Sequence, residues 1–158
     1  MNEPLTMVPI GVVHNDVTAA KGVRWQKVVS RIRIAPELAS ALEGVEAFSH
    51  LLVIFGFHQS PAGPAPLQVH PQGRAELPLV GVFATRSPRR PNPIAVTVVE
   101  LLARTENVLT VRGLDALDGT PVLDLKPYLP RGEQIDKFRV PRWVKQLREM
   151  HDQEKDHE

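Results

Sequence analysis

The stretch GVFATRSPRRPNPIAVTVV, residues 81–99, places a proline-rich segment between two β-rich runs. β-Branched and small apolar residues dominate residues 81–85 and 94–99, which predicts a strand on each side. Between them, Pro88, Pro91 and Pro93 fix φ, remove backbone donors and keep the preceding residues out of helical conformation. The sequence therefore predicts a stiff loop held between two strands.

This loop carries the guanidinium groups of Arg86, Arg89 and Arg90 and the amide of Asn92. Guanidinium groups bind carboxylates and phosphates through paired hydrogen bonds, so the loop could form an anion site for an amino-acid carboxylate or an RNA backbone. The alternative is a solvated turn with structural ion pairs. We favour the anion site, because a loop that proline already makes rigid loses little entropy on binding.

Composition limits the classes of function. The chain has 158 residues, a formal net charge of +1 and no cysteine. This length fits one domain, the charge indicates no molecule-wide attraction to nucleic acid, and the lack of cysteine excludes disulfides and cysteine-based zinc sites. His14, His50 and His70 show no metal-ligand spacing, so we assign no metal. No apolar run is long enough to span a bilayer, and we expect a cytoplasmic protein.

Short β-type runs outnumber helical ones along the rest of the chain. We predict further strands at residues 8–14, 28–34, 48–58, 108–114 and 120–125, and residues 100–104 continue or end the strand at 94–99. Pro36 and Pro141 each begin a helical pattern. Because helices do not alternate with strands, we predict a mainly β fold, either a barrel or a sandwich, with a few short helices. Residues 1–140 would form this β domain, and residues 141–158 a C-terminal helix and charged tail.

Other polar residues lie where strands meet turns. His58 and Gln59 end the most apolar strand, and could bind a ligand or satisfy the local turn. Asp118 lies in a DG turn, for which a structural role is common. Asp124 lies inside an apolar strand and needs a partner, either Lys126 or the arginine loop. Trp25 could stack on a planar ligand or cover the edge of the core.

Three motifs in this order, EAFSHLLVIFGFHQS, GVFATRSPRRPNPIAV and LDGTPVLDLKPYLP, resemble the TrmO/YaeB-like (TsaA-like) family of S-adenosylmethionine-dependent methyltransferases. The resemblance covers roughly residues 10–130. It implies a single-sheet antiparallel or mixed β-barrel that binds S-adenosylmethionine and works as a homodimer. It also implies methylation of N6 of threonylcarbamoyladenosine beside the anticodon of tRNA.

The same resemblance implies site residues. The expected cofactor contacts are His58, Gln59, Arg86, Val96, Asp118, Gly119, Thr120 and Pro121, with Arg90 and Asn92 shaping the same pocket. Asp118 and Asp124 are the candidate catalytic residues, as proton acceptors near the target nitrogen.

Two departures from the family pattern leave the substrate open. Ala95 replaces the usual glycine after RPNPI, and the chain ends soon after the barrel, whereas the tRNA enzymes carry an additional C-terminal domain. The alternatives are a methyltransferase for a small metabolite and a non-catalytic barrel that binds anions or RNA or senses a ligand.

Overall fold

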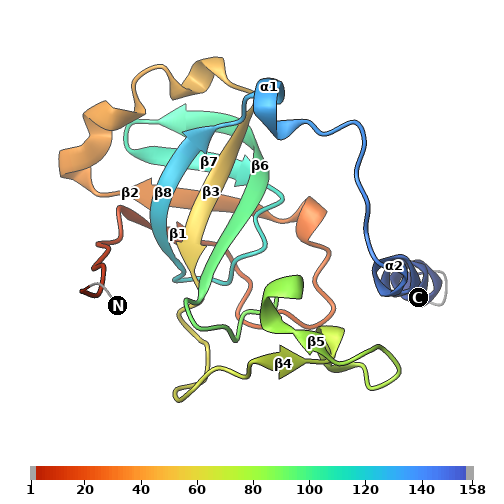
Figure 1. The fold of residues 1–158 in the computed structure, drawn as a ribbon. Coiled ribbons are helices and arrows are strands. Elements are labelled where there is room, and N and C mark those ends of the chain that lie inside the picture. The colour runs from red at the N-terminus through yellow and green to blue at the C-terminus, as the bar shows by residue number, and fades with distance from the viewer. Residues whose placement is uncertain (1–2, 156–158) are drawn as a thin grey trace.

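Six antiparallel strands close into a barrel in the order β1-β2-β7-β6-β3-β8 (Figure 1). The computed structural model describes residues 3–155. The barrel strands are β1 (Gly11–His14), β2 (Val29–Ile34), β3 (His50–Gly56), β6 (Ile94–Thr105), β7 (Val108–Arg112) and β8 (Pro121–Pro127). Since β8 pairs with β1, the sheet closes on itself, which confirms the predicted single-sheet barrel.

The core lies inside the barrel and follows the alternation of the strands. On β2, Ser30, Ile32 and Ile34 are buried while Arg31 and Arg33 are exposed. β3 alternates in the same way, with Leu51, Val53 and Phe55 buried. Fully burying one such side chain stabilises the fold by about 1.5–3 kcal/mol, so these inward rows fix the register of the strands.

The helices are short and lie outside the barrel. The 3-10 helices are η1 (Trp25–Lys27), η2 (Pro36–Leu42), η3 (Val45–Ala47), η4 (Pro71–Gly73) and η5 (Val82–Ala84), and the α-helices are α1 (Pro130–Glu133) and α2 (Arg142–Lys155). Proline begins η2, as expected, but the turn is a 3-10 helix. In Figure 1, α2 lies to the side of the barrel at the end of an extended segment, and His151 Nε2 lies 2.8 Å from Gln72 Oε1.

The helix α2 also takes in the first residues of the expected charged tail, and the last three residues of that tail lie outside the described part. Within residues 3–155, no helix is long and apolar enough to cross a membrane.

The predicted strand at residues 81–85 is wrong beyond its first residue. β5 (Val80–Gly81) pairs only with β4 (Gln68–Val69), and η5 follows it at once. Thr85 closes this turn, because both its backbone N–H and its hydroxyl donate to the Val82 carbonyl. Val82 is buried while Phe83 is 77% exposed, so the β-branched composition reflects packing of Val82 and not a sheet.

β6 is longer than either neighbour can cover. It pairs with β3 from Ile94 to Glu100, but with β7 only from Glu100 onward. The other edge of its first residues is therefore not paired with a barrel strand. This edge lies at the end of the barrel where β3 ends and β8 begins (Figure 1).

A bulge on β8 sets the direction of Asp124. Phe55 pairs with Val122 and Ile54 with Asp124, so Leu123 is an extra residue in β8. Val122 is buried with Phe55 inside the barrel, whereas Asp124 lies on the outer face with Ile54. Without the bulge, Asp124 would share the inward face of Val122.

Candidate functional site

Two cavities adjoin at the end of the barrel where β3 ends and β6 and β8 begin. We call the first the apolar pocket; its volume is about 260 Å³. We call the second the arginine pocket; its volume is about 520 Å³. Phe57 and Asp115 line both cavities and form the wall between them.

The arginine pocket contains four of the sequence-predicted residues, which are Arg86, Arg90, Asn92 and Val96. Arg90 is committed to its own loop: its Nη1 donates to the Thr85 carbonyl at 3.1 Å and to the Ser87 carbonyl at 3.5 Å. Its guanidinium also lies 5.9 Å from the centre of the Phe83 ring, within range of a cation–π contact. Arg90 thus holds the loop in shape.

Arg86 lines the same pocket and is exposed. Among the described residues, it has no hydrogen-bond or ion-pair partner. Its charge remains available to an anion in the cavity, where a guanidinium can bind a carboxylate through two parallel hydrogen bonds. Arg86 and Arg90 therefore have different roles in the same loop: Arg90 binds the carbonyls of Thr85 and Ser87, whereas Arg86 is available to a ligand.

The floor of the arginine pocket is the unpaired edge of β6. Ile94, Ala95, Val96 and Thr97 line it in sequence. Backbone N–H and C=O groups at an open strand edge can bind a polar ligand in place of a neighbouring strand. Because Val96 is 50% exposed, its side chain can also cover an apolar part of that ligand.

The apolar pocket is built around aromatic rings. Phe55 and Phe57 meet edge to face with their centroids 5.8 Å apart, and both line the cavity together with Trp25. Trp25 therefore lies where it could stack on a planar ligand. Ser60 donates to the Pro88 carbonyl at 3.2 Å, which ties the loop after β3 to the arginine loop at the mouth of this cavity.

Two predicted groups of cofactor contacts, the pair His58-Gln59 and the turn at residues 118–121, meet at the apolar pocket. His58, Gln59 and Thr120 line it, and the Thr120 hydroxyl lies 3.3 Å from His58 Nδ1. Gly119 has φ of +78°, and a Cβ there would lie 3.7 Å from His58 Nε2. A side chain at Gly119 would fit beside the histidine but would be strained by the positive φ, so the backbone conformation of the turn favours glycine there.

The two predicted catalytic aspartates lie outside both cavity linings. Asp118 accepts a hydrogen bond from the Asn15 backbone N–H at 3.0 Å and lies 3.9 Å from His14 Nδ1. Asp124 forms an ion pair with Lys126 at 2.7 Å on the outer face of the barrel, so Lys126 is the partner that it required.

Asp115 is the aspartate that lines both cavities, and it accepts a hydrogen bond from the Thr97 hydroxyl. Asp115 lies three residues before Asp118, in the loop that follows β7. No pattern in the sequence distinguishes it from Asp118 and Asp124.

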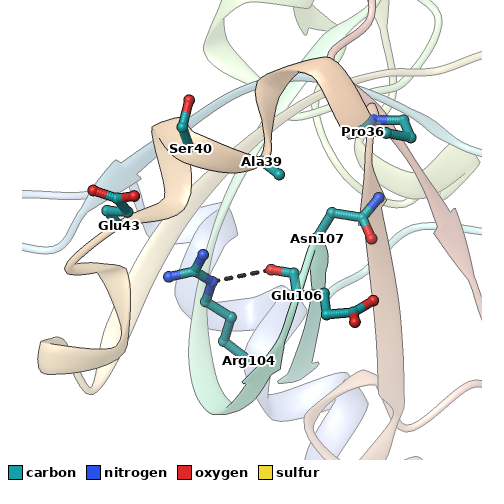
Figure 2. Close-up of a pocket in the computed structure, with 7 residues that line it drawn as sticks. All are labelled: Pro36, Ala39, Ser40, Glu43, Arg104, Glu106 and Asn107. Atoms are coloured by element: carbon teal, nitrogen blue, oxygen red, sulfur yellow. Dashed lines mark hydrogen bonds between the residues drawn. The ribbon is translucent and has the colours of Figure 1, made fainter.

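A third depression lies at the opposite end of the barrel (Figure 2). Its volume is about 410 Å³, and it lies between η2 and the turn that joins β6 to β7. Arg104 is its main cation, but Arg104 donates to the carbonyls of Leu42 and Glu106, each at 3.1 Å, and pairs with Glu46 at 3.2 Å. The Arg104 charge is thus engaged in holding η2 and η3 against the barrel.

Within the described range, no three His, Asp or Glu side chains come together as metal ligands.

Comparison with known proteins gives one consistent family. Residues 15–134 match the family model for the N-terminal domain of tRNA-methyltransferase O. An S-adenosyl-L-methionine-binding protein of Archaeoglobus fulgidus is 43% identical over 140 residues, which cover 85% of this chain and 96% of that protein.

Two further comparisons concern longer proteins. The tRNA (adenine(37)-N6)-methyltransferase of Escherichia coli is 46% identical over 107 residues, covering 65% of this chain and 46% of that enzyme. The crystal structure of TrmO from Pseudomonas aeruginosa superimposes with a TM-score of 0.72 at 31% identity, covering 87% of this chain and 61% of that one. The chain thus spans about half to three fifths of the length of these two proteins.

Proposed function

This chain belongs to the tRNA-methyltransferase O family, and on that premise we propose that it methylates N6 of threonylcarbamoyladenosine in tRNA with S-adenosylmethionine as the methyl donor. The A. fulgidus relative, which this chain covers almost completely, supports the cofactor. The E. coli relative supports the substrate. The observation that carries the proposal is the unpartnered guanidinium of Arg86 in a cavity that adjoins an aromatic one.

The residues present fit S-adenosylmethionine. An amino-acid carboxylate suits Arg86, and an ammonium group or ribose hydroxyls suit the carboxylate of Asp115. A planar adenine suits the aromatic apolar pocket, whose lining includes Thr120 as a polar residue. We therefore keep the ten cofactor contacts expected from the sequence as part of the proposal and add Asp115 to them.

The reaction requires alignment above all. S-adenosylmethionine, when bound, supplies an electrophilic methyl group on a sulfonium. The protein's task is to hold the attacking nitrogen in line and to keep water out, for which the proline-framed loop and the aromatic walls are suited. The N6–H group of threonylcarbamoyladenosine loses its proton when the nitrogen gains a methyl group, and a carboxylate at the wall of both cavities can accept that proton, directly or through water.

We place Asp115 in this proton-accepting role ahead of Asp118, whose carboxylate already holds the Asn15 backbone. Asp124 would reach a reacting nitrogen only from the outer face, where Lys126 neutralises its charge.

The proposal includes a homodimer. On the outer face, Leu52 pairs in register with Val98, and Ile54 with Val96, forming an apolar row across β3 and β6. Val96 and Val98 are 50% and 47% exposed, and Val96 also lines the arginine pocket. A second copy packed on this row would cover both valines beside the cavity. A tRNA substrate would also place the protein in the cytoplasm, as expected from the sequence.

Two measurements test the function. Calorimetry with S-adenosylmethionine should show binding, and no heat at millimolar cofactor would refute the cofactor assignment. Mass spectrometry of tRNA nucleosides after reaction should show one added methyl group on threonylcarbamoyladenosine. Labelled methyl found only in a small-molecule extract would instead indicate a metabolite methyltransferase. RNA binding without any methyl transfer would indicate a non-catalytic binder.

A further inference from the structure

The outer face of β2 carries two arginines at successive outward positions. Arg31 and Arg33 are exposed, whereas Ser30, Ile32 and Ile34 between and beside them are buried in the barrel. Two residues along a strand span about 6.8 Å, so the two guanidinium groups leave the surface side by side. Neither arginine lines the apolar pocket or the arginine pocket.

The charge on this face is not compensated. Across the strands, Arg31 lies in register with His14 and Thr110, and Arg33 with Val12 and Val108, so no neighbour in register is acidic. No carboxylate of the described part forms an ion pair with either arginine. Elsewhere on the barrel the cations do pair with acids: Arg104 with Glu46, Arg112 with Glu100 and Lys126 with Asp124.

The face is continuous with the mouth of the apolar pocket. The loop that leads from β1 into β2 contributes Ala20 and Trp25 to the pocket lining. The same loop carries Lys21 and Lys27, which are exposed and have no described partner. We call Lys21, Lys27, Arg31 and Arg33 the β2 basic strip. It begins beside the pocket and follows β2 along the barrel.

We propose that the β2 basic strip binds the phosphodiester backbone of the RNA whose target base is methylated beside Asp115, at the wall between the two cavities. This inference rests on the proposed function and extends it to the surface that holds the substrate. Guanidinium and ammonium groups on a sheet face bind phosphates without reading sequence, so the strip positions the RNA and the site around Asp115 selects the base. A molecule with a net charge of only +1 needs such a local surface to attract a polyanion.

The test compares tRNA binding of the parent protein with that of the double variants Arg31→Gln/Arg33→Gln and Arg31→Lys/Arg33→Lys. Fluorescence anisotropy between 50 and 200 mM salt gives both the affinity and its salt dependence. Each lost phosphate contact lowers the slope of log affinity against log salt by about 0.7–0.9. The glutamine variant should lose about tenfold or more in affinity and about 1.4–1.8 in slope. The lysine variant should keep most of both, because it retains the charges.

Arg112→Gln is the matched control, since Arg112 lies on the same outer face but is paired with Glu100 at 3.0 Å. It should leave the salt slope unchanged. Cofactor affinity by calorimetry should be the same in all the proteins, which also shows that the variants are folded. A glutamine variant with the parent affinity and slope for tRNA would overturn the inference.

Two outcomes separate this inference from the proposed function. If the glutamine variant methylates tRNA with an unchanged KM for tRNA, phosphate binding by the strip is refuted and the proposed methyltransferase function is not affected. Weakened tRNA binding in that variant, with no methyl transfer by the parent protein, would refute the function and support the strip. The last measurement is binding to vesicles that contain an anionic phospholipid. If the glutamine variant loses vesicle binding but keeps tRNA binding, the assignment of the strip to RNA is refuted.

Discussion

Thr97 on β6 donates a hydrogen bond from its hydroxyl to the carboxylate of Asp115, which follows β7. The bond joins two segments that the strand pairing leaves apart, because β7 pairs with β6 only from Glu100 onward. It holds the Asp115 carboxylate at the wall of both cavities. The position of this charge is therefore set by the barrel and not by a flexible loop, as a catalytic or binding carboxylate requires.

Replacing Asp115 by asparagine should lower the rate of methyl transfer by about tenfold or more, because the amide keeps the shape and the Thr97 contact but cannot accept a proton. The measurement is methyl incorporation into tRNA at saturating cofactor. Asp124→Asn is the control, and should change the rate by no more than about twofold, as expected for a surface substitution. A larger loss of rate in Asp124→Asn than in Asp115→Asn would place the reaction on the outer face of the barrel.

Arg86→Ala should weaken S-adenosylmethionine binding by about 10- to 100-fold. A hydrogen bond to a charged group contributes about 1.5–3 kcal/mol, and Arg86 has no described protein partner that would compete for it. Calorimetry gives the affinity directly. Arg112→Ala, which removes an exposed arginine away from both cavities, is the control. An Arg86→Ala protein with the parent affinity would show that the loop serves another ligand.

The barrel could be predicted from the sequence because its strands alternate clearly, as on β2 and β3, and the loop could be predicted because proline restricts φ whatever surrounds it. The different roles of Arg86 and Arg90 could not be predicted. Arg90 holds the loop because the carbonyls of Thr85 and Ser87 lie within its reach, and only the folded loop shows this. The strand expected at residues 81–85 is wrong for a related reason, because Thr85 closes a 3-10 turn on the Val82 carbonyl, a contact that composition does not indicate.

The choice among three aspartates was beyond the sequence. Side chains alternate between the two faces of a strand, so the sequence alone places Asp124 on the inward face with Val122. The bulge at Leu123 turns Asp124 outward. Asp115 has no pattern of its own, because it lies after β7 in a loop, where the Thr97 hydroxyl holds its carboxylate. A bulge and one side-chain hydrogen bond therefore decide which carboxylate faces the cavities.

Arg104→Ala should destabilise the fold by about 1–3 kcal/mol, because it leaves the carbonyls of Leu42 and Glu106 without their donor. Denaturant unfolding gives the free energy. Arg112→Ala is the control, since its pair with Glu100 is exposed on both sides and should contribute no more than about 1 kcal/mol. An equal loss of unfolding free energy in the two variants would contradict the structural role of Arg104.

The same pair of variants has a predictable response to pH. The pKa of Glu46 is lowered from its ordinary value of 4.5, first by its own backbone N–H and then by Arg104. A lowered pKa stabilises the folded state above the ordinary value, and this contribution is lost as the pH falls through the folded pKa. The stability gap between Arg104→Ala and the parent should therefore narrow in acid below about pH 4.5. A gap that widens in acid would contradict the ion pair.

Val98→Lys should shift the protein from dimer to monomer and raise the dimer dissociation constant by about tenfold or more. A lysine at this 47% exposed position places a charge in the centre of the apolar row of Leu52, Ile54, Val96 and Val98, where a second copy would have to desolvate it. Sedimentation velocity across a range of protein concentrations measures the change. Val29→Lys is the matched control, because Val29 is 48% exposed on the outer face of β2, away from the row. A parent protein that is monomeric at high concentration would refute the dimer, and an unchanged Val98→Lys dimer would place the interface elsewhere.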